Sequence, residues 1–273
     1  MSIRPVFFVS DGTGITAETL GRSLLTQFEG LDFKQTVIPF VDSEEKAEEC
    51  LQRFEAAKRE YGVRPVVFST LLKAGVRAVI GRADALVFDF FESFLSPLEA
   101  ELGMRSSHTV GRSHSMGDTP DYQARIEAVN FALAYDDGQE ARGLEDADVI
   151  LIGVSRSGKT PTCLYMAMQM GVKAANYPLV PEDFERGTLP PCLEPHLGKL
   201  YGLSIDPERL ARIRNERRPG SRYADLENCR YEVAQAERLM QKYGVRWLNS
   251  TARSVEEIAT KILEDAKLER RVY

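Results

Sequence analysis

The chain has 273 residues, of which 43% are hydrophobic and 28% charged, and 35 basic against 41 acidic side chains give a net charge of -6. This length allows one large or two modest domains, and the composition excludes wholesale disorder and membrane spans. The acidic balance argues against nucleic acid as the main partner. Four scattered cysteines without a C-x-x-C pair, and a start that runs straight into a strand, predict a cytoplasmic protein without a zinc site.

The first half of the chain alternates strands with helices. Residues 5–10 form an apolar run closed by the glycine-bearing turn 11–14, and residues 15–27 follow with helical periodicity. Such alternation indicates a parallel sheet covered by helices. Further predicted elements are a strand at 36–41, a helix capped by Ser43 that runs through Glu60, strands at 64–68 and 85–90, a polar loop at 103–119 and a helix at 122–135.

The second half repeats this alternation after a boundary that we place near Gly143. The turn 136–138 ends the preceding helix, and a charged stretch to residue 146 is typical of a linker. We therefore expect an α/β protein with an N-terminal parallel-sheet domain, residues 1–143, and a P-loop kinase-like domain, residues 144–273. The predicted elements of this domain are a buried strand at 147–152, a helix at 160–170, strands at 172–179, 201–205 and 245–249, and a helix at 254–269.

The strongest chemical signal is a complete G-x-x-x-x-G-K-[ST] motif between the buried strand and its helix. A strand delivers the loop, glycines let backbone N–H groups surround phosphate oxygens, and the helix start faces the anion. Lys159 would neutralise phosphate charge, and the Thr160 hydroxyl would ligate Mg²⁺. The predicted nucleotide-binding residues are Gly153, Val154, Ser155, Arg156, Ser157, Gly158, Lys159 and Thr160.

A phosphate loop alone does not distinguish kinases, ATPases and GTPases. The chain lacks an Asn-Lys-x-Asp motif, which disfavours guanine and makes adenine the better choice. Asp206, at the end of the predicted strand 201–205, is a candidate catalytic carboxylate and metal ligand. It could equally cap the helix that follows, because Asp before Pro207 is ordinary at a helix start. Both readings can be true.

A basic strip from Glu208 to Arg222 stands out in this acidic chain, with six arginines against two glutamates. An arginine-rich segment beyond the phosphate loop is typical of a phosphoryl-transfer lid, because guanidinium groups stabilise charge on the transferred group. Arg217 and Arg218, beside a Pro-Gly turn, are our leading catalytic lid residues. The alternative is a solvated helix face. The six arginines are Arg209, Arg212, Arg214, Arg217, Arg218 and Arg222.

Three other features carry two interpretations each. The turn Ser10–Thr16 joins a strand to a helix and could present N–H groups to an anion, but it lacks a lysine and could be a tight turn only. His108 and His114 lie in the polar loop, as a catalytic base or as inert surface residues. Asp136 and Asp137 could act as a general base for a hydroxyl nucleophile, or they could simply end a helix.

Several sequence blocks in order carry a family resemblance over essentially the whole length. They are residues 9–18, 125–128 with Phe131, 136–138, 153–156 with 159–162, 176–181, 202–210 and 223–225. With these blocks the chain resembles the bifunctional serine/threonine kinase and phosphorylase family that regulates phosphoenolpyruvate synthase and pyruvate, phosphate dikinase. The sequence of residues 7–21 is most similar to the proteobacterial phosphoenolpyruvate synthase branch of this family.

The resemblance implies two reactions on one target threonine beside the catalytic histidine of the dikinase. ADP donates the phosphate that inactivates the target, and inorganic phosphate then removes it as pyrophosphate, although the residues alone would have favoured ATP. It also implies phosphoenolpyruvate synthase as protein substrate and a homodimer, whereas Mg²⁺ as cofactor follows from the phosphate-loop motif. The family motif carries nucleotide binding onto Gly153 through Thr160, with Gly158 where many relatives have serine. The roles of Asp206, Arg217 and Arg218 are inferred from chemistry alone.

The mechanism we expect is in-line transfer at one anion site that serves both directions. Two other functions stay open on the residues. A small-metabolite kinase of the shikimate or adenylate kinase type shares the phosphate loop and the arginine-rich lid. A nucleotide-gated binding module would use the N-terminal sheet to dock a partner without catalysis. Phosphoryl transfer to a small acid or alcohol would favour the first, and tight ADP binding without transfer the second.

Overall fold

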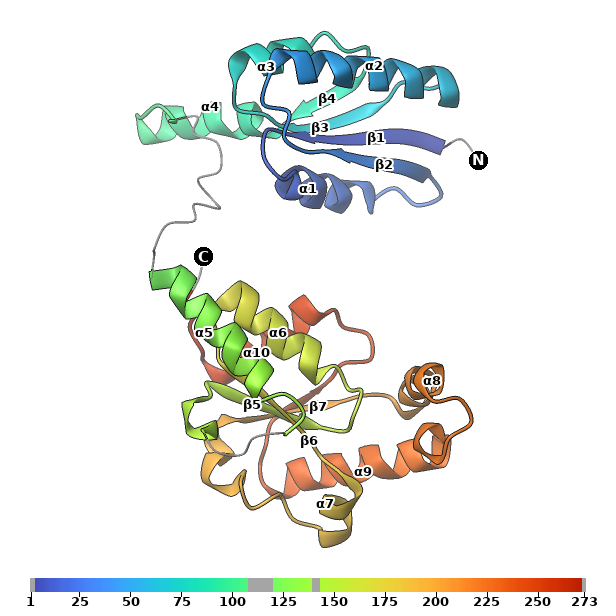
Figure 1. Ribbon diagram of the computed structural model, residues 1–273, viewed down its shortest axis with the longest axis vertical. Coiled ribbons are helices and arrows are strands. Elements are labelled where there is room, and N and C mark those ends of the chain that lie inside the picture. Colours follow the sequence, from blue (N-terminus) through green and yellow to red (C-terminus); the bar gives the residue numbers. More distant parts are fainter. Residues whose placement is uncertain (1–2, 108–119, 139–142, 272–273) are drawn as a thin grey trace. The chain divides into compact units, whose positions relative to one another are not determined.

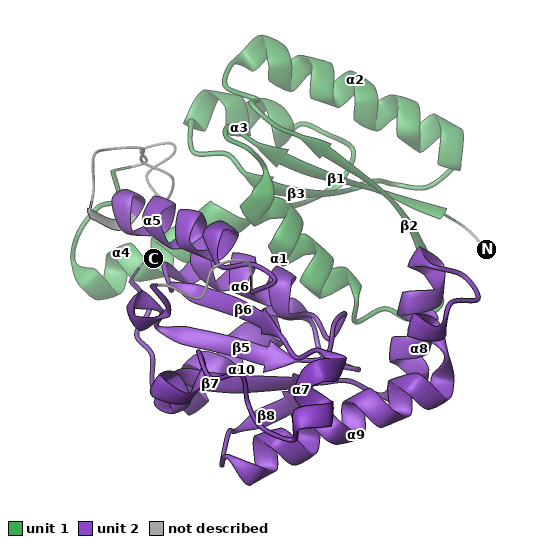
Figure 2. Ribbon diagram, turned by 60° about the horizontal axis from the view of Figure 1, so that its bottom comes forward, with its two compact units in different colours: residues 1–115 green, residues 116–273 purple. Residues whose placement is uncertain are grey.

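The computed structural model of the protein describes residues 3–107, 120–138 and 143–271, and the chain divides into two compact units, residues 1–115 and 116–273 (Figure 2). Each unit contains a four-stranded sheet in which every neighbouring pair of strands is parallel. The predicted α/β class with two parallel sheets is therefore confirmed. Within the described ranges, no helix has the length and apolar character needed to cross a membrane.

The first unit has the strand order β2-β1-β3-β4, with helices on both faces of the sheet (Figure 1). Phe7 and Val9 of the first strand pack with the second and third helices on one face, and Val6 and Phe8 pack with the first helix on the other. The elements are β1 (Ile3–Ser10), α1 (Ile15–Leu25), β2 (Asp32–Ile38), α2 (Glu44–Tyr61), β3 (Val66–Thr70), α3 (Ala74–Ile80), β4 (Leu86–Asp89) and α4 (Phe90–Leu102).

Side-chain caps explain where two of these helices begin. Ser43 Oγ accepts a hydrogen bond from the Lys46 backbone N–H, so the predicted start of α2 is confirmed. Asp89 Oδ1 accepts one from the Glu92 N–H at 3.0 Å, and α4 starts at Phe90 directly after β4. The apolar run at 85–90 predicted a strand through Phe90 and no α4, because no turn residue separates the strand from the helix. The predicted loop at 103–119 falls mostly outside the described residues, as do His108 and His114.

The second unit has the strand order β6-β5-β7-β8. Figure 1 shows α5, α6 and α10 on one face of this sheet and α7 and α9 on the other. The elements are α5 (Pro120–Ala134), β5 (Val149–Gly153), α6 (Lys159–Met170), β6 (Ala174–Pro178), α7 (Pro181–Arg186), β7 (Leu200–Ser204), α8 (Pro207–Arg217), a short 3-10 helix at Arg222–Ala224, α9 (Leu226–Lys242), β8 (Trp247–Asn249) and α10 (Val255–Ala266).

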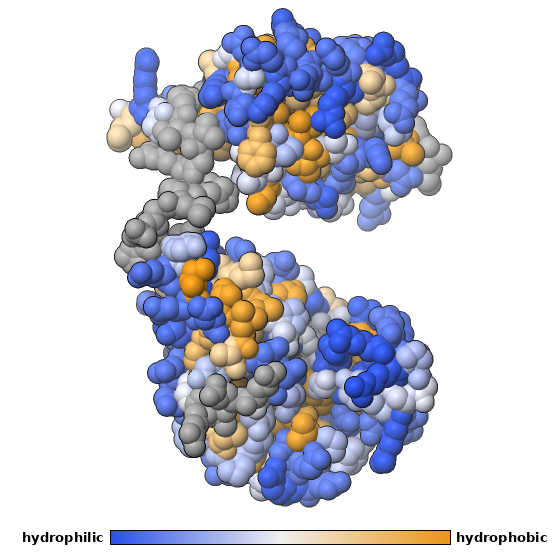
Figure 3. All heavy atoms as spheres, viewed as in Figure 1, coloured by the Kyte–Doolittle hydropathy of each residue, from blue (hydrophilic) through white to orange (hydrophobic). Residues whose placement is uncertain are grey.

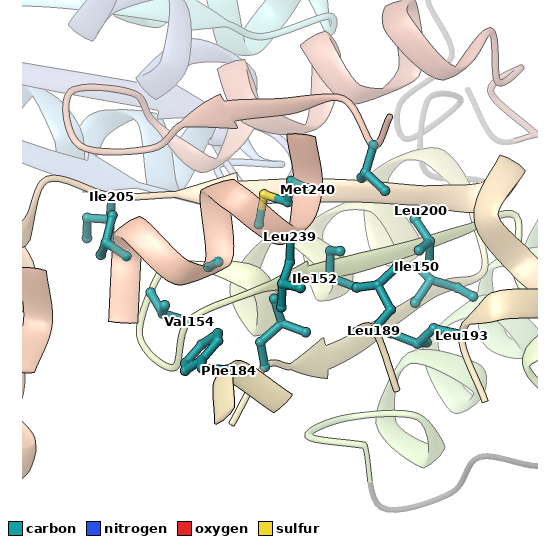
Figure 4. Packing of buried hydrophobic residues seen from close by; sticks show 14 of the residues in the cluster. Ile150, Ile152, Val154, Phe184, Leu189, Leu193, Leu200, Ile205, Leu239 and Met240 are labelled. Atoms are coloured by element: carbon teal, nitrogen blue, oxygen red, sulfur yellow. The ribbon is translucent and has the colours of Figure 1, made fainter. Parts of the chain in front are cut away.

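The central strand β5 is buried along its whole length, as its unbroken branched residues predict. Ile150 and Ile152 pack in one cluster with Leu239 and Met240 of α9 (Figure 4). Leu151 packs in the cluster on the opposite face, which contains residues of α5, α6 and α10. Apolar side chains on both faces fix β5 in the middle of the sheet, so the loop that follows it starts from a rigid support.

Helix α5 belongs to the second unit. Its Ala128 and Ala132 are buried in the same cluster as Cys163 and Met166 of α6. The boundary expected near Gly143 therefore lies inside this unit, whereas the compact units divide between residues 115 and 116. The turn after α5 has the composition of a linker, but it carries residues of the site described next.

Candidate functional site

The loop between β5 and α6 has the backbone shape of an anion cradle. Strand β5 ends at Gly153 and α6 starts at Lys159. Arg156 and Gly158 have φ values of 76° and 95°, and left-handed residues of this kind turn successive N–H groups toward one side. A Cβ atom on Gly153 would lie 2.2 Å from the Leu203 carbonyl oxygen of β7. Glycine is therefore required where the loop leaves the sheet.

Side chains hold three carbonyl groups of this loop. A carbonyl that accepts a hydrogen bond is satisfied and held in place, which leaves the neighbouring N–H groups available for an anion. This arrangement favours phosphate oxygens in the loop. The bonds run from Lys159 Nζ to the Val154 oxygen at 2.8 Å, from Arg214 Nη2 to the Ser155 oxygen at 3.1 Å, and from Ser250 Oγ to the Ser157 oxygen at 2.9 Å.

Lys159 is a buried cation whose charge the protein does not fully compensate. Its side chain is only 4% exposed. Burial lowers the pKa of Lys159 to about 8, and Cys163, Asp137 and Asp136 oppose this shift more weakly. A polyphosphate in the loop would restore the charged form, because an adjacent anion stabilises an ammonium group. Lys159 is therefore suited to bind a ligand that brings its own negative charge.

Two carboxylates lie beside the phosphate loop, in the turn that follows α5. Thr160 Oγ1 donates to Asp136 Oδ1 at 3.0 Å. The Asn176 amide nitrogen of β6 lies 2.6 Å from Asp136 Oδ1, 3.1 Å from Asp137 Oδ1 and 2.9 Å from Thr160 Oγ1. The Asn176 Oδ1 atom is buried and has no hydrogen-bond partner among the described residues. Four oxygen-bearing side chains thus converge at the start of α6.

Asp137, Thr160 and Asn176 line a pocket of about 250 Å³. Pockets for whole drug-sized ligands span roughly 300–1,000 Å³, so this one suits the phosphates of a nucleotide better than the entire molecule. Asp137 is exposed at the pocket, while Lys159 and Asn176 are buried. The lining residues are Asp137, Ser155, Arg156, Gly158, Lys159, Thr160, Pro161 and Asn176.

The other predicted site residues do not line this pocket. Asp206 Oδ1 accepts a hydrogen bond from the Arg209 N–H at 3.0 Å, so Asp206 caps α8, as one of the two readings predicts. Arg217 and Arg218 are exposed at the end of α8. Figure 3 shows strongly hydrophilic side chains over this helix. The structure brings Asp136 to Thr160, whereas the sequence pattern predicted Asp206 as the carboxylate that shares a metal with Thr160.

Arg214 is the member of the basic strip that reaches the loop, and its charge alone did not distinguish it from the exposed arginines. It is fully buried. Leu210 and Arg214 are the buried residues of α8 and lie four positions apart. This helical spacing was the available signal, because residues four apart share one helix face. Arg214 therefore belongs to the inner face of α8, with the apolar residue and away from the solvent-facing arginines.

The turn Ser10–Thr16 of the first unit uses its polar groups internally. Ser10 Oγ accepts from the Gly12 N–H at 3.1 Å, and Asp11 Oδ2 accepts from the Leu72 N–H at 2.9 Å. Gly14 caps α1 with a left-handed backbone. These bonds agree with the tight-turn interpretation of the motif.

Comparisons with known proteins agree with this geometry. The family model described as kinase/pyrophosphorylase matches residues 6–263. Proteins of Burkholderia thailandensis, Burkholderia mallei and Burkholderia pseudomallei are each 60% identical over 268 residues, which is 98% of this chain and 98% of each relative. Each carries the name phosphoenolpyruvate synthase regulatory protein. The match spans both units and includes the phosphate loop, so the chain is an enzyme that belongs to the kinase/pyrophosphorylase family.

Proposed function

We propose that this enzyme regulates phosphoenolpyruvate synthase by two opposed reactions on one threonine of that protein. ADP-dependent phosphorylation inactivates the target, and phosphate-dependent dephosphorylation releases pyrophosphate and reactivates it. The family membership and the names of the relatives support this proposal. The observation that carries it is the phosphate loop with a buried lysine and two adjacent carboxylates. We further infer that the enzyme acts in the cytoplasm as a homodimer.

The residues beside the loop fit a magnesium ion. Mg²⁺ takes oxygen ligands and is usually held by one or two carboxylates together with substrate phosphates. The Thr160 hydroxyl and the Asp136 carboxylate supply such oxygens 3.0 Å apart, and the unpartnered Asn176 Oδ1 is a further buried oxygen nearby. When bound, Mg²⁺ would neutralise charge that develops on the phosphates. Asp206 is the weaker candidate ligand, because its Oδ1 already caps α8.

In the kinase direction, the threonine oxygen of the target attacks the β-phosphorus of ADP. The bond between that phosphorus and the bridging oxygen breaks, AMP leaves, and the threonine hydroxyl loses its proton. We assign the acceptance of this proton to Asp137, the exposed carboxylate at the pocket. Lys159 and the loop N–H groups hold the diphosphate in place.

In the opposite direction, inorganic phosphate occupies the loop and attacks the phosphorus of phosphothreonine. The bond from that phosphorus to the threonine oxygen breaks, the oxygen regains a proton, and pyrophosphate forms. One anion site and one carboxylate thus serve both reactions. Arg217 and Arg218, exposed at the end of α8, remain our candidates for lid residues that neutralise charge on the transferred phosphoryl group.

The test is to incubate the enzyme with phosphoenolpyruvate synthase and ADP that is labelled in the β-phosphate. We expect labelled phosphothreonine on the target and its loss as labelled pyrophosphate when phosphate is added. The variant Lys159→Ala is expected to lose both reactions, since they share the anion site. Label on a small acid or alcohol instead of the target would contradict the proposal, and full activity of Lys159→Ala would contradict the shared site.

A further inference from the structure

Arg214 connects α8 to the phosphate loop. Together with Lys159 it makes up the buried cations in the part of the chain that the structure describes. Its guanidinium donates to the Ser155 carbonyl of the loop at 3.1 Å and to the Tyr223 carbonyl at 3.1 Å. The same group lies over the Tyr223 ring, 4.1 Å from the ring centroid. A single side chain therefore contacts the loop and the segment between α8 and α9.

The charge of Arg214 is already matched within the protein. Its Nη2 donates to Glu232 Oε2 of α9 at 2.7 Å, and the other oxygen of Glu232 accepts from Asn228 at 2.8 Å. A buried guanidinium that is paired in this way contributes little attraction for a further anion. Arg214 is thus suited to hold backbone groups in place, in contrast to the exposed arginines of α8.

The position of the Ser155 carbonyl affects the backbone conformation of the loop. The next residue, Arg156, has a φ of 76°, a conformation that a residue with a side chain adopts only when its surroundings enforce it. The bond from the buried Arg214 to the Ser155 oxygen supports this conformation and leaves the following N–H groups to face the pocket. The Tyr223 hydroxyl adds a second link, a hydrogen bond of 2.9 Å with Ser155 Oγ.

We propose that Arg214 and Tyr223 are positioning residues that keep the phosphate loop in its anion-binding shape and couple the loop to residues 218–225. Occupation of the loop by a nucleoside diphosphate would then order this connection, and disorder of the connection would weaken binding. The inference rests on the nucleotide site proposed above. It goes further, because it gives Arg214 of the basic strip a role that does not depend on contact with the ligand.

Two conservative variants test the proposal. Tyr223→Phe keeps the ring beneath Arg214 and removes only the bond to Ser155. Arg214→Lys keeps a positive charge near Glu232, but a single ammonium group cannot reach Glu232 and both carbonyls as the planar guanidinium does. The matched controls are Tyr231→Phe and Arg230→Lys on α9, because Tyr231 is exposed and Arg230 pairs with Glu208 and Glu227 on the surface.

Two measurements are made on the full chain: the dissociation constant for ADP and the rate of tryptic cleavage after Arg217 and Arg222. ADP is expected to slow cleavage of the unmodified protein by about fivefold or more. Arg214→Lys should raise the dissociation constant by about tenfold and Tyr223→Phe by about fivefold. In both variants saturating ADP should no longer protect the cleavage sites. The two controls should behave like the unmodified protein.

The outcomes separate this inference from the proposed function. Absence of ADP binding by the unmodified protein would contradict the proposed function. If the unmodified protein binds ADP and both positioning variants bind and protect equally well, the coupling proposal is overturned. Should Arg214→Lys fail to fold, Tyr223→Phe alone decides, since it removes one hydroxyl and should leave the thermal unfolding midpoint unchanged.

Discussion

At the scale of single residues, the site depends on an ammonium group and carboxylates whose properties come from their surroundings. Lys159 could be predicted as a phosphate-binding residue from the G-x-x-x-x-G-K-[ST] motif alone. Its buried position, its bond to the Val154 carbonyl and its lowered pKa follow from the packing of α6 against the sheet. For Asp136 and Asp137 the sequence left two interpretations open, a general base or the end of a helix. Their proximity to Thr160 depends on how α5 packs, which a local pattern does not encode.

The buried lysine predicts pH-dependent nucleotide binding. Because the pKa of Lys159 in the free protein is lowered to about 8, its charged fraction falls as the pH rises above 8. Polyphosphate favours the charged form, so binding takes up a proton, and affinity should fall by up to about tenfold per pH unit above pH 8. Calorimetry in two buffers of different ionisation enthalpy measures this uptake. Lys159→Arg, which stays charged, should bind independently of pH, and a flat profile for the unmodified protein would contradict the prediction.

Substitutions of the two neighbouring carboxylates, Asp136 and Asp137, should change different kinetic parameters. Asp136→Asn removes the charge next to the Thr160 hydroxyl, so we expect the Mg²⁺ concentration for half-maximal activity to rise by about 10–100-fold. Asp137→Asn should leave this Mg²⁺ dependence and ADP binding unchanged but lower kcat by about a hundredfold or more in both directions. Steady-state kinetics over a Mg²⁺ series distinguishes them. Identical behaviour of the two variants would refute the separate assignment.

At the scale of elements, strands at or near their observed positions could be predicted from apolar runs and their turn residues. Helices α3, α4, α7 and α9 were not predicted. Helix α4 follows its strand without a turn, and α3 and α7 are short. Helix α9 did carry an available signal, because Asp225 caps its start by accepting from the Asn228 N–H. Which arginine of α8 faces inward, Arg214, also became clear only from the fold. Asp206, by contrast, fulfils the helix-cap reading at a position where a metal role had equal support.

The close approach of β5 and β7 predicts a difference between two glycines of the loop. Gly153→Ala forces a methyl group onto the Leu203 carbonyl oxygen and should lower the free energy of unfolding by about 3 kcal/mol or more. Gly158 also has a positive φ, but open space surrounds its missing Cβ, so Gly158→Ala should cost about 1 kcal/mol. Urea unfolding of both variants measures the difference. Equal losses would show that the contact with β7 is not decisive.

The cap of α8 separates the two interpretations of Asp206. Asp206→Asn retains an oxygen that can accept from the Arg209 N–H, whereas Asp206→Ala removes the cap at a cost of about 1 kcal/mol. If capping is its function, the asparagine variant should keep both stability and phosphoryl transfer. Loss of transfer in a stable Asp206→Asn protein would restore Asp206 as a metal ligand. Thermal unfolding and the phosphothreonine assay provide the two readouts.

At the scale of the whole molecule, the chain consists of two units with separate cores. Each of the four clusters of buried hydrophobic residues described lies within one unit. The number of units was predictable from length and motif placement. The division between residues 115 and 116 was not, because α5 joins the second sheet through small buried alanines that give no strong periodic signal.

Separate cores predict separate responses to ligand. ADP at about a hundred times its dissociation constant should stabilise the unit that contains the phosphate loop by about 2.7 kcal/mol. Calorimetric heating should then show one transition that moves to higher temperature and another that does not. A single transition that shifts as a whole would show instead that the units unfold cooperatively. Lys159→Ala, which should not bind ADP, is the matched control.

The order of the strands, β2-β1-β3-β4 and β6-β5-β7-β8, has one more consequence. In both sheets the first strand pairs with the second on one side and the third on the other, so the two sheets have the same topology. Both first strands end in a glycine-bearing turn at an equivalent place, Ser10–Thr16 and Gly153–Thr160. Only the second turn has a lysine. The proposed nucleotide site thus occupies one of two equivalent positions, and the first turn offers a natural location for grafting a second phosphate loop.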